Sequence, residues 1–147
     1  MEKLKESKLL KIRDVIRTED SRVNYLRGLM RIAESDKDKT SAEEGYIYKI
    51  AEILGASYSE LLQAEDQQGN DSPAEIRFTT TQEKMLFLMQ ALYMCWLDDD
   101  YSEAERKEIK VIGNELGVDL SKVEKIESWV KHGIEWMSAG AELIGLE

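Results

Sequence analysis

Apolar residues recur every three or four positions through most of the chain, the spacing of helices that each bury one face. The sequence has no clear run of alternating apolar and polar residues, which would indicate a half-buried strand. Its one proline, Pro73, lies outside the helical pattern. The pattern predicts an all-α bundle of about seven to eight helices, with helical segments at residues 3–17, 21–35, 41–54, 59–64, 81–97, 103–116 and 122–145.

The predicted helix ends carry start and stop signals. Gly55 and Gly117 follow two of the helices, and glycine is favoured where a left-handed residue ends a helix. Ser121 is expected to cap the last helix, which His132–Gly133 is expected to kink or divide. Residues 65–79 contain Gly, Asn, Asp, Ser and Pro and are predicted to be a linker. Three Ser/Thr-x-x-Glu pairs predict capping boxes at helix starts: Thr40 with Glu43, Thr80 with Glu83, and Ser102 with Glu105.

The apolar faces define the expected core. Helix 81–97 is apolar on most sides, which places it at the centre of the bundle. Gly28 lies inside a predicted helix at a cost of about 1 kcal/mol relative to Ala, so close contact with another helix is expected there. Trp129 and Trp136 are two helical turns apart and fit either core anchors or a contact between two copies of the chain. The inward positions of the last helix are predicted to be Val123, Ile126, Trp129, Val130, Ile134, Trp136, Met137 and Leu143.

Part of the sequence occurs twice. With Gly55 aligned to Gly117, an offset of 62 residues, segments 28–64 and 90–126 share 9 identities in 37 pairs. Composition alone would give about two or three. The sequence therefore predicts a single domain, residues 1–147, built from two related helix–loop–helix halves.

The composition of the chain limits which ligands and which cellular compartment are expected. The 147-residue chain has a net charge of −10, which repels phosphate backbones, so nucleic acid is not an expected ligand. A single cysteine, Cys95, excludes an internal disulfide and fits a reducing compartment. The first ten residues lack the apolar stretch of a signal peptide, and no segment approaches the roughly 20 apolar residues that span a bilayer. A cytoplasmic protein without membrane insertion is expected.

Two acidic loops are the candidate site for chemistry, because each holds an Asp-x-Asp pair and precedes a helix with a glutamate in its first turn. One loop has too few oxygen ligands for Ca²⁺ or Mg²⁺, so the two loops would have to act together. An EF-hand is excluded, because Glu103 and Ile109 would occupy its required Gly and Glu positions. The alternative needs no ion, since negative charge beside a helix N-terminus is stabilised by about 0.3–1 kcal/mol. The candidate metal ligands are Asp36, Asp38, Glu43, Asp98, Asp100 and Glu105.

The acidic loop and its capping box resemble those of the TerB-like family, which includes tellurite-resistance B proteins and the N-terminal domain of a membrane-anchored DnaJ-like co-chaperone. The shared pattern is Asp-x-Asp, then Ser/Thr-x-x-Glu, then an amphipathic helix ending in Leu-Gly. Here it reads LDDDYSEAERKEIKVIGNELGV and, more weakly, SDKDKTSAEEGYIYKIAEILGA. The resemblance covers about residues 23–64 and 82–126. TerB-like loops usually carry Gly after the second acidic position, where this chain has Lys39 and Tyr101.

The resemblance implies an all-α bundle with an acidic surface suited to divalent cations, and a role linked to metal or envelope stress. A non-enzymatic module of this kind is the predicted function. The alternative is a metal-free interaction or scaffold module, in which the acidic face or the tryptophans bind a partner or a second copy. An enzyme with paired carboxylates is least expected, because such pairs work in clefts and these carboxylates are expected to be exposed. The single histidine, His132, and Cys95 are expected to be structural.

Overall fold

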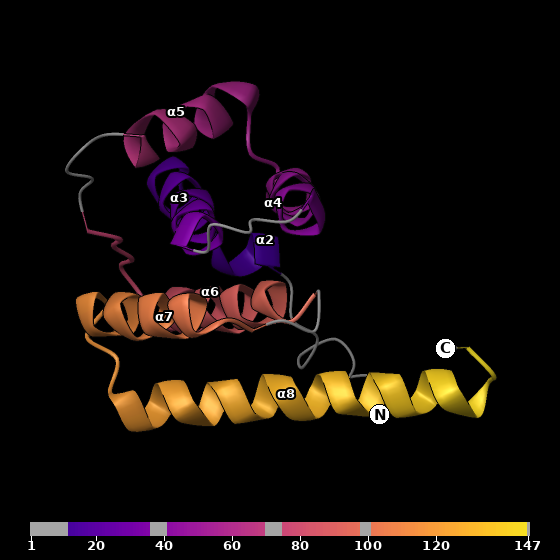
Figure 1. Ribbon diagram of the computed structural model, residues 1–147. Helices are drawn as coiled ribbons and strands as arrows, with labels where there is room; N and C mark the ends of the chain where they lie inside the picture. The colour runs from indigo at the N-terminus through magenta and orange to yellow at the C-terminus, as the bar shows by residue number, and fades with distance from the viewer. Residues whose placement is uncertain (1–11, 36–40, 70–74, 98–100, 147) are drawn as a thin grey trace.

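The computed structural model describes residues 12–35, 41–69, 75–97 and 101–146 (Figure 1). These residues form helices and no strand, which confirms the predicted all-α fold class. The described helices are α2 (Ile12–Val15), α3 (Glu19–Ser35), α4 (Ser41–Leu54), α5 (Tyr58–Gln68), α6 (Thr81–Cys95), α7 (Glu103–Glu115) and α8 (Leu120–Leu143). None of them is both long and apolar enough to cross a membrane.

Helices α3, α4, α6, α7 and α8 begin and end within two residues of their predicted limits. The capping boxes predicted at Thr80–Glu83 and Ser102–Glu105 are confirmed, whereas Thr40 and most of the predicted helix 3–17 lie outside the described residues. Helix α5 is longer than predicted and includes the first part of the predicted linker. Its start is fixed by a capping box between Ser57 and Glu60, which places the helix start at Tyr58.

Helix α8 departs most from the sequence prediction. It is one continuous helix through His132–Gly133, and its N-cap is Asp119 rather than Ser121. The predicted inward residues Val123, Ile126 and Val130 are buried. Four others that were predicted to face inward are exposed, so that prediction was wrong for Trp129, Trp136, Met137 and Leu143. In Figure 1 the C-terminal half of α8 extends past the ends of α6 and α7. Of this half, Ile134 still packs against the core, while the residues beyond it extend past the other described helices.

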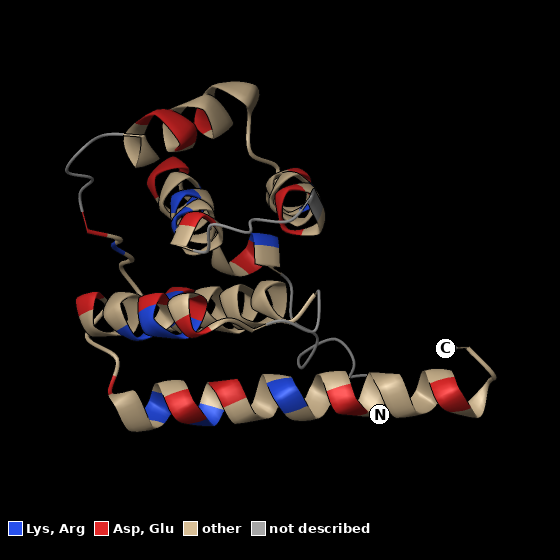
Figure 2. Cartoon of the chain, viewed as in Figure 1, with Lys and Arg blue, Asp and Glu red and all other residues tan. Residues whose placement is uncertain are grey.

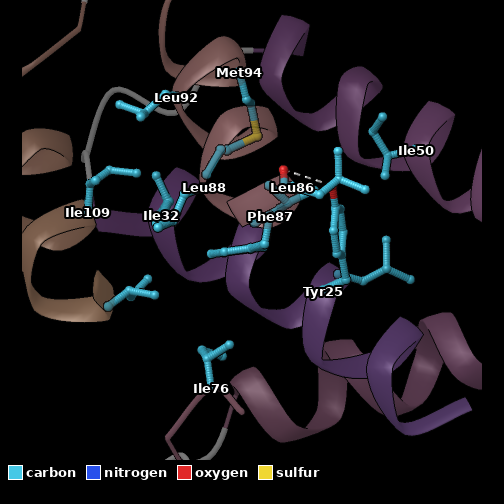
Figure 3. Close-up of a cluster of buried hydrophobic side chains, with 14 of the residues drawn as sticks. Tyr25, Ile32, Ile50, Ile76, Leu86, Phe87, Leu88, Leu92, Met94 and Ile109 are labelled. Atoms are coloured by element: carbon cyan, nitrogen blue, oxygen red, sulfur yellow. Dashed lines mark hydrogen bonds between the residues drawn. The ribbon is translucent and has the colours of Figure 1, made fainter. Parts of the chain in front are cut away.

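The helices form three layers around one apolar core. In Figure 1, α3, α4 and α5 lie on one side of α6 and α7, and α8 lies on the other side. Helix α3 packs against α4, α5, α6 and α7, while α6 also packs against α2, α4, α7 and α8. Figure 3 shows the side chains that fill the space between them, the largest of which are fully buried at Tyr25, Ile32, Ile76, Phe87, Leu88, Leu92, Met94 and Ile109. Cys95 is buried among them, as predicted.

The helices begin at matching positions in the two halves of the chain. Helices α3 and α6, α4 and α7, and α5 and α8 each start 62 residues apart, the offset of the sequence alignment. Equivalent residues also contact each other between halves. The Ser21 hydroxyl donates a hydrogen bond to Glu83, and the rings of Tyr25 and Phe87 meet edge to face with centroids 5.5 Å apart. Contacts of this kind arise where two similar units pack about an approximate twofold axis.

The crossing of α3 and α6 is close because Gly28 has no side chain. A Cβ atom on Gly28 would lie 2.5 Å from Cζ and 2.6 Å from Cε1 of Phe87, whose side chain is fully buried. On the other side of the axis, the Tyr25 hydroxyl donates a hydrogen bond to Gln90. Gly28 therefore has the packing role that its position in the sequence predicted.

Two equivalent glycines end the equivalent helices α4 and α7. Gly55 and Gly117 have φ values of 71° and 74°, in the left-handed region that favours glycine. The next residues complete the helix ends, because Ala56 N donates to Ala51 O and Val118 N donates to Gly113 O, both at 2.9 Å. The sequence prediction for both helix ends is confirmed.

Gly28→Ala is predicted to destabilise the fold although Ala favours helices. The added methyl group must displace the buried ring of Phe87, which costs about 1–3 kcal/mol, while helix propensity returns about 1 kcal/mol. Gly45→Ala is the matched control, since Gly45 lies inside α4 and nothing approaches its Cβ position within 4 Å. Urea denaturation should show a net loss for Gly28→Ala and a gain for Gly45→Ala. Equal stabilisation by both variants would contradict the packing role of Gly28.

Candidate functional site

The structure describes two of the six candidate ligands. Asp36, Asp38, Asp98 and Asp100 lie outside the described residues. Glu43 and Glu105 lie in the first turns of α4 and α7, and their exposed fractions are only 4% and 1%. The expectation of exposed carboxylates was therefore wrong for these two glutamates.

The Glu43 and Glu105 side chains contact each other through a hydrogen bond. They are equivalent residues of the two halves, so this is a third contact of a residue with its counterpart, after Ser21 with Glu83 and Tyr25 with Phe87. The starts of α4 and α7 are thus brought together at one place. The sequence alignment contained this signal, because both glutamates are the third residue of their helices and are 62 positions apart.

The capping box at the start of α7 fixes the position of Glu105. The backbone N–H of Ser102 donates to Glu105 Oε1 at 3.1 Å, and the backbone N–H of Glu105 donates to the Ser102 hydroxyl at 3.1 Å. These bonds hold the carboxyl group over the N-terminal end of the helix. Glu105 is therefore oriented by its own helix before it meets Glu43.

Burial and the hydrogen bond to Glu43 raise the pKa of Glu105 to about 8. Two carboxyl groups can share a hydrogen bond only when one of them is protonated. Glu105 therefore holds a proton at neutral pH, as expected for a buried carboxyl group close to another one. The local charge of this site changes within the physiological pH range.

Glu83, the glutamate of the capping box in α6, has a pKa that is shifted in the opposite direction from that of Glu105. Burial acts to raise the pKa of Glu83, but hydrogen bonds from Ser21, Thr79 and Thr80 outweigh it and lower the pKa. Glu83 meets hydroxyl and backbone donors, while Glu105 meets a second carboxyl group. The same sequence motif therefore produces a stable carboxylate in α6 and a shared proton in α7.

Tyr101 anchors the chain just before α7. Its ring lies 5.4 Å from that of Trp96, and the Arg106 guanidinium lies 4.7 Å above it. Its hydroxyl donates a 2.8 Å hydrogen bond to Glu127 of α8. Burial and this bond raise the pKa of Tyr101, so the phenol remains neutral. Tyr101 thus ties the start of α7 to α6 and α8.

The described residues alone do not form a metal centre. No group of three His, Cys, Asp or Glu side chains with the geometry for a metal ion occurs among residues 12–35, 41–69, 75–97 and 101–146. Glu43 and Glu105 offer two carboxyl groups, while Ca²⁺ and Mg²⁺ need six or more oxygen ligands in total. Any further protein ligand from the predicted set would come from the four aspartates of the acidic loops.

Comparisons with protein-family models, curated proteins and solved structures found no match to this chain.

Replacing Glu105 with Gln is predicted to change how stability depends on pH. Between about pH 4.5 and 8 the folded state keeps a proton that the unfolded state releases. Wild-type stability from this group should therefore fall as pH rises through that window, by up to about 1.4 kcal/mol per pH unit. Gln preserves the capping bond but cannot lose a proton. Denaturant titrations from pH 5 to 8.5 should show a smaller fall for Glu105→Gln than for wild type.

Glu103→Gln is the control, because Glu103 is exposed in the same first turn. The stability of Glu103→Gln should change with pH in the same way as the stability of wild type. Parallel curves for wild type and Glu105→Gln would mean that the pair does not hold its proton in this range.

Proposed function

We propose that this chain is a non-enzymatic, TerB-like helical module that binds a divalent cation, Ca²⁺ or Mg²⁺, where α4 and α7 begin. The observation that carries the proposal is the contact between Glu43 and Glu105, which brings equivalent carboxyl groups of the two halves to one place. The sequence motifs that resemble the TerB-like family support the same reading and suggest a cytoplasmic role in metal or envelope stress.

The carboxyl pair suits a cation because an ion can replace the proton that lies between Glu43 and Glu105. Two buried carboxylates repel each other, and the shared proton relieves that repulsion. A divalent cation relieves it more strongly, since it brings two positive charges and binds carboxylate oxygens directly. In this proposal, Asp36, Asp38, Asp98 and Asp100 supply further oxygens from the two acidic loops, and water completes the coordination.

Competition with the proton makes the proposed binding depend on pH. Because the pKa of Glu105 is about 8, ion binding near neutral pH must release close to one proton. Affinity should therefore rise as pH increases from about 6 to 8.5, the range in which the carboxyl pair loses its proton in the absence of an ion. This dependence separates the pair from exposed acidic residues, which are already ionised at pH 6.

Calorimetric titration with Ca²⁺ and Mg²⁺ tests the proposal. Titrations in two buffers of different ionisation enthalpy should reveal about one proton released per ion at pH 7.5. With a Kd near 1 mM, 10 mM ion would stabilise the fold by about 1.4 kcal/mol and raise Tm by about 3–5 °C. The double variant Glu43→Gln, Glu105→Gln should lose the heat, the proton release and the Tm shift. Asp98→Asn, Asp100→Asn should weaken all three.

Glu135→Gln removes a carboxylate from the exposed surface of α8 and serves as the matched control, with binding expected to equal that of wild type. A cation site at the pair is ruled out by either of two results. One is no heat and no Tm shift at 10 mM ion and pH 8.5. The other is undiminished binding by the double variant.

A second candidate function is a metal-free interaction module. The observation that favours it is the exposure of Trp129 and Trp136, at 57% and 78%, on a helix that extends beyond the bundle. Large exposed aromatic residues are typical of protein interfaces. The two functions use different parts of the chain, so neither excludes the other.

A further inference from the structure

One face of α8 carries an exposed stripe in which large residues alternate with glycine. The stripe consists of Trp129, Gly133, Trp136, Gly140 and Leu143, at positions i, i+4, i+7, i+11 and i+14 of the helix. This spacing places all five side-chain positions on one side. Val123, Ile126 and Val130, which pack against the bundle, lie roughly 90° away around the helix. The Trp–Gly stripe is therefore separate from the face that the fold uses.

The glycines of the stripe have no packing role within the described part of the chain. A Cβ atom added to Gly133 or Gly140 would meet nothing within 4 Å. Glycine inside a helix is unfavourable relative to alanine. A close neighbour occupies the space at Gly28 and Gly113, whereas Gly45 of α4 is open, as are the two glycines of the stripe. The two glycines of the stripe instead leave shallow gaps on the surface, each one turn from a tryptophan.

We propose that the Trp–Gly stripe is a docking surface for a second copy of this chain, with the two α8 helices antiparallel. In the register that places Trp136 opposite Gly133 of the second copy, Trp129 falls opposite Gly140 of the second copy. The twofold relation repeats both contacts in reverse, so each tryptophan of the pair meets a glycine. A parallel arrangement in register would instead place tryptophan against tryptophan and glycine against glycine.

Charge along α8 favours the antiparallel direction. Its lysines, Lys122, Lys125 and Lys131, lie in the N-terminal half, as Figure 2 shows. Residues 132–147 contain three glutamates and no Lys or Arg. In the proposed register, Lys122 and Lys125 approach the C-terminal end of the second helix, where the helix dipole adds partial negative charge. A parallel pair would bring these lysines against one another.

The size of the surface predicts weak but specific association. A fully buried tryptophan contributes about 150–250 Å², and Trp129 and Trp136 are 57% and 78% exposed, so the four tryptophans account for roughly 400–700 Å². Leu143 of each copy, which is 87% exposed, adds to this area. The total lies below the range of stable specific interfaces, so we expect weak association, in the micromolar range or above.

Sedimentation equilibrium of the full chain from about 1 to 200 µM, with EDTA present, tests the proposal independently of cation binding. Wild type should change from monomer to dimer over this range. Gly133→Leu and Gly140→Leu fill the gaps but favour the helix, and each should weaken association at least tenfold, as expected for residues at the centre of an interface. Ser138→Leu adds the same bulk on the opposite face of α8 and should leave the dimer unchanged.

The direction of the helices is measured with a spin label on Lys122→Cys. The native Cys95 is buried, which directs the label to the introduced thiol. Antiparallel helices in the proposed register separate the two labelled positions by about 37 Å along the axis, since they are offset by 25 residues. Parallel helices bring them to about 10 Å.

Three kinds of outcome would overturn the proposal. One is a monomer at every concentration with both tryptophans open to a soluble quencher. Another is a monomer whose tryptophans are protected at all concentrations, which would mean that residues outside the described part of the chain cover the stripe. The last is a dimer that both Gly→Leu variants leave intact, or one whose labels lie at the short separation.

Discussion

The close crossing of α3 and α6 is the contact on which the rest of the structure depends. Gly28 lets the ring of Phe87 lie against the backbone of α3, and Tyr25 meets the same ring edge to face. Every other long helix packs against one or both of these two helices. A side chain at Gly28 would push the halves apart at their centre, and the contacts of α4, α5, α7 and α8 would change with it. Packing of this kind transmits a small local change because protein interiors are close to crystalline density.

The approximate twofold relation between the two halves has a chemical consequence. A residue close to the twofold axis contacts the equivalent residue of the other half. When the two residues differ, they can be complementary, as the Ser21 hydroxyl and the Glu83 carboxylate are. When they are identical and acidic, they must share a proton or an ion, which is the situation of Glu43 and Glu105. A glutamate that acts only as a helix cap does not need such a neighbour, since the buried capping glutamates Glu60 and Glu83 meet Arg22 and Ser21 instead of a second carboxyl group. The burial of both residues is what gives the site its sensitivity to protons.

The sequence correctly predicted the features of the fold that depend on local signals. Apolar periodicity located the helices, and the glycines at 55 and 117 located two helix ends. It also identified Glu43 and Glu105 as candidates, yet it treated them as part of an exposed acidic surface. Their burial depends on how two distant helix starts pack, which the spacing within one helix does not contain. The error in α8 has the same origin: apolar residues such as Trp136 fit an inward face by spacing, but the bundle ends before it reaches them.

The two halves also differ where α5 and α8 diverge in length. The last residue of α5, Gln68, corresponds to Val130 in α8, and Val130 is the last buried residue of that helix. The part of α8 that matches α5 therefore completes the bundle, as α5 does on α3. The part beyond it has no counterpart in α5 and carries the exposed apolar residues Trp136, Met137 and Leu143. The other described residues leave these side chains exposed. Contiguous exposed apolar residues are typical of interaction surfaces, which is the physical basis of the dimer proposed for α8.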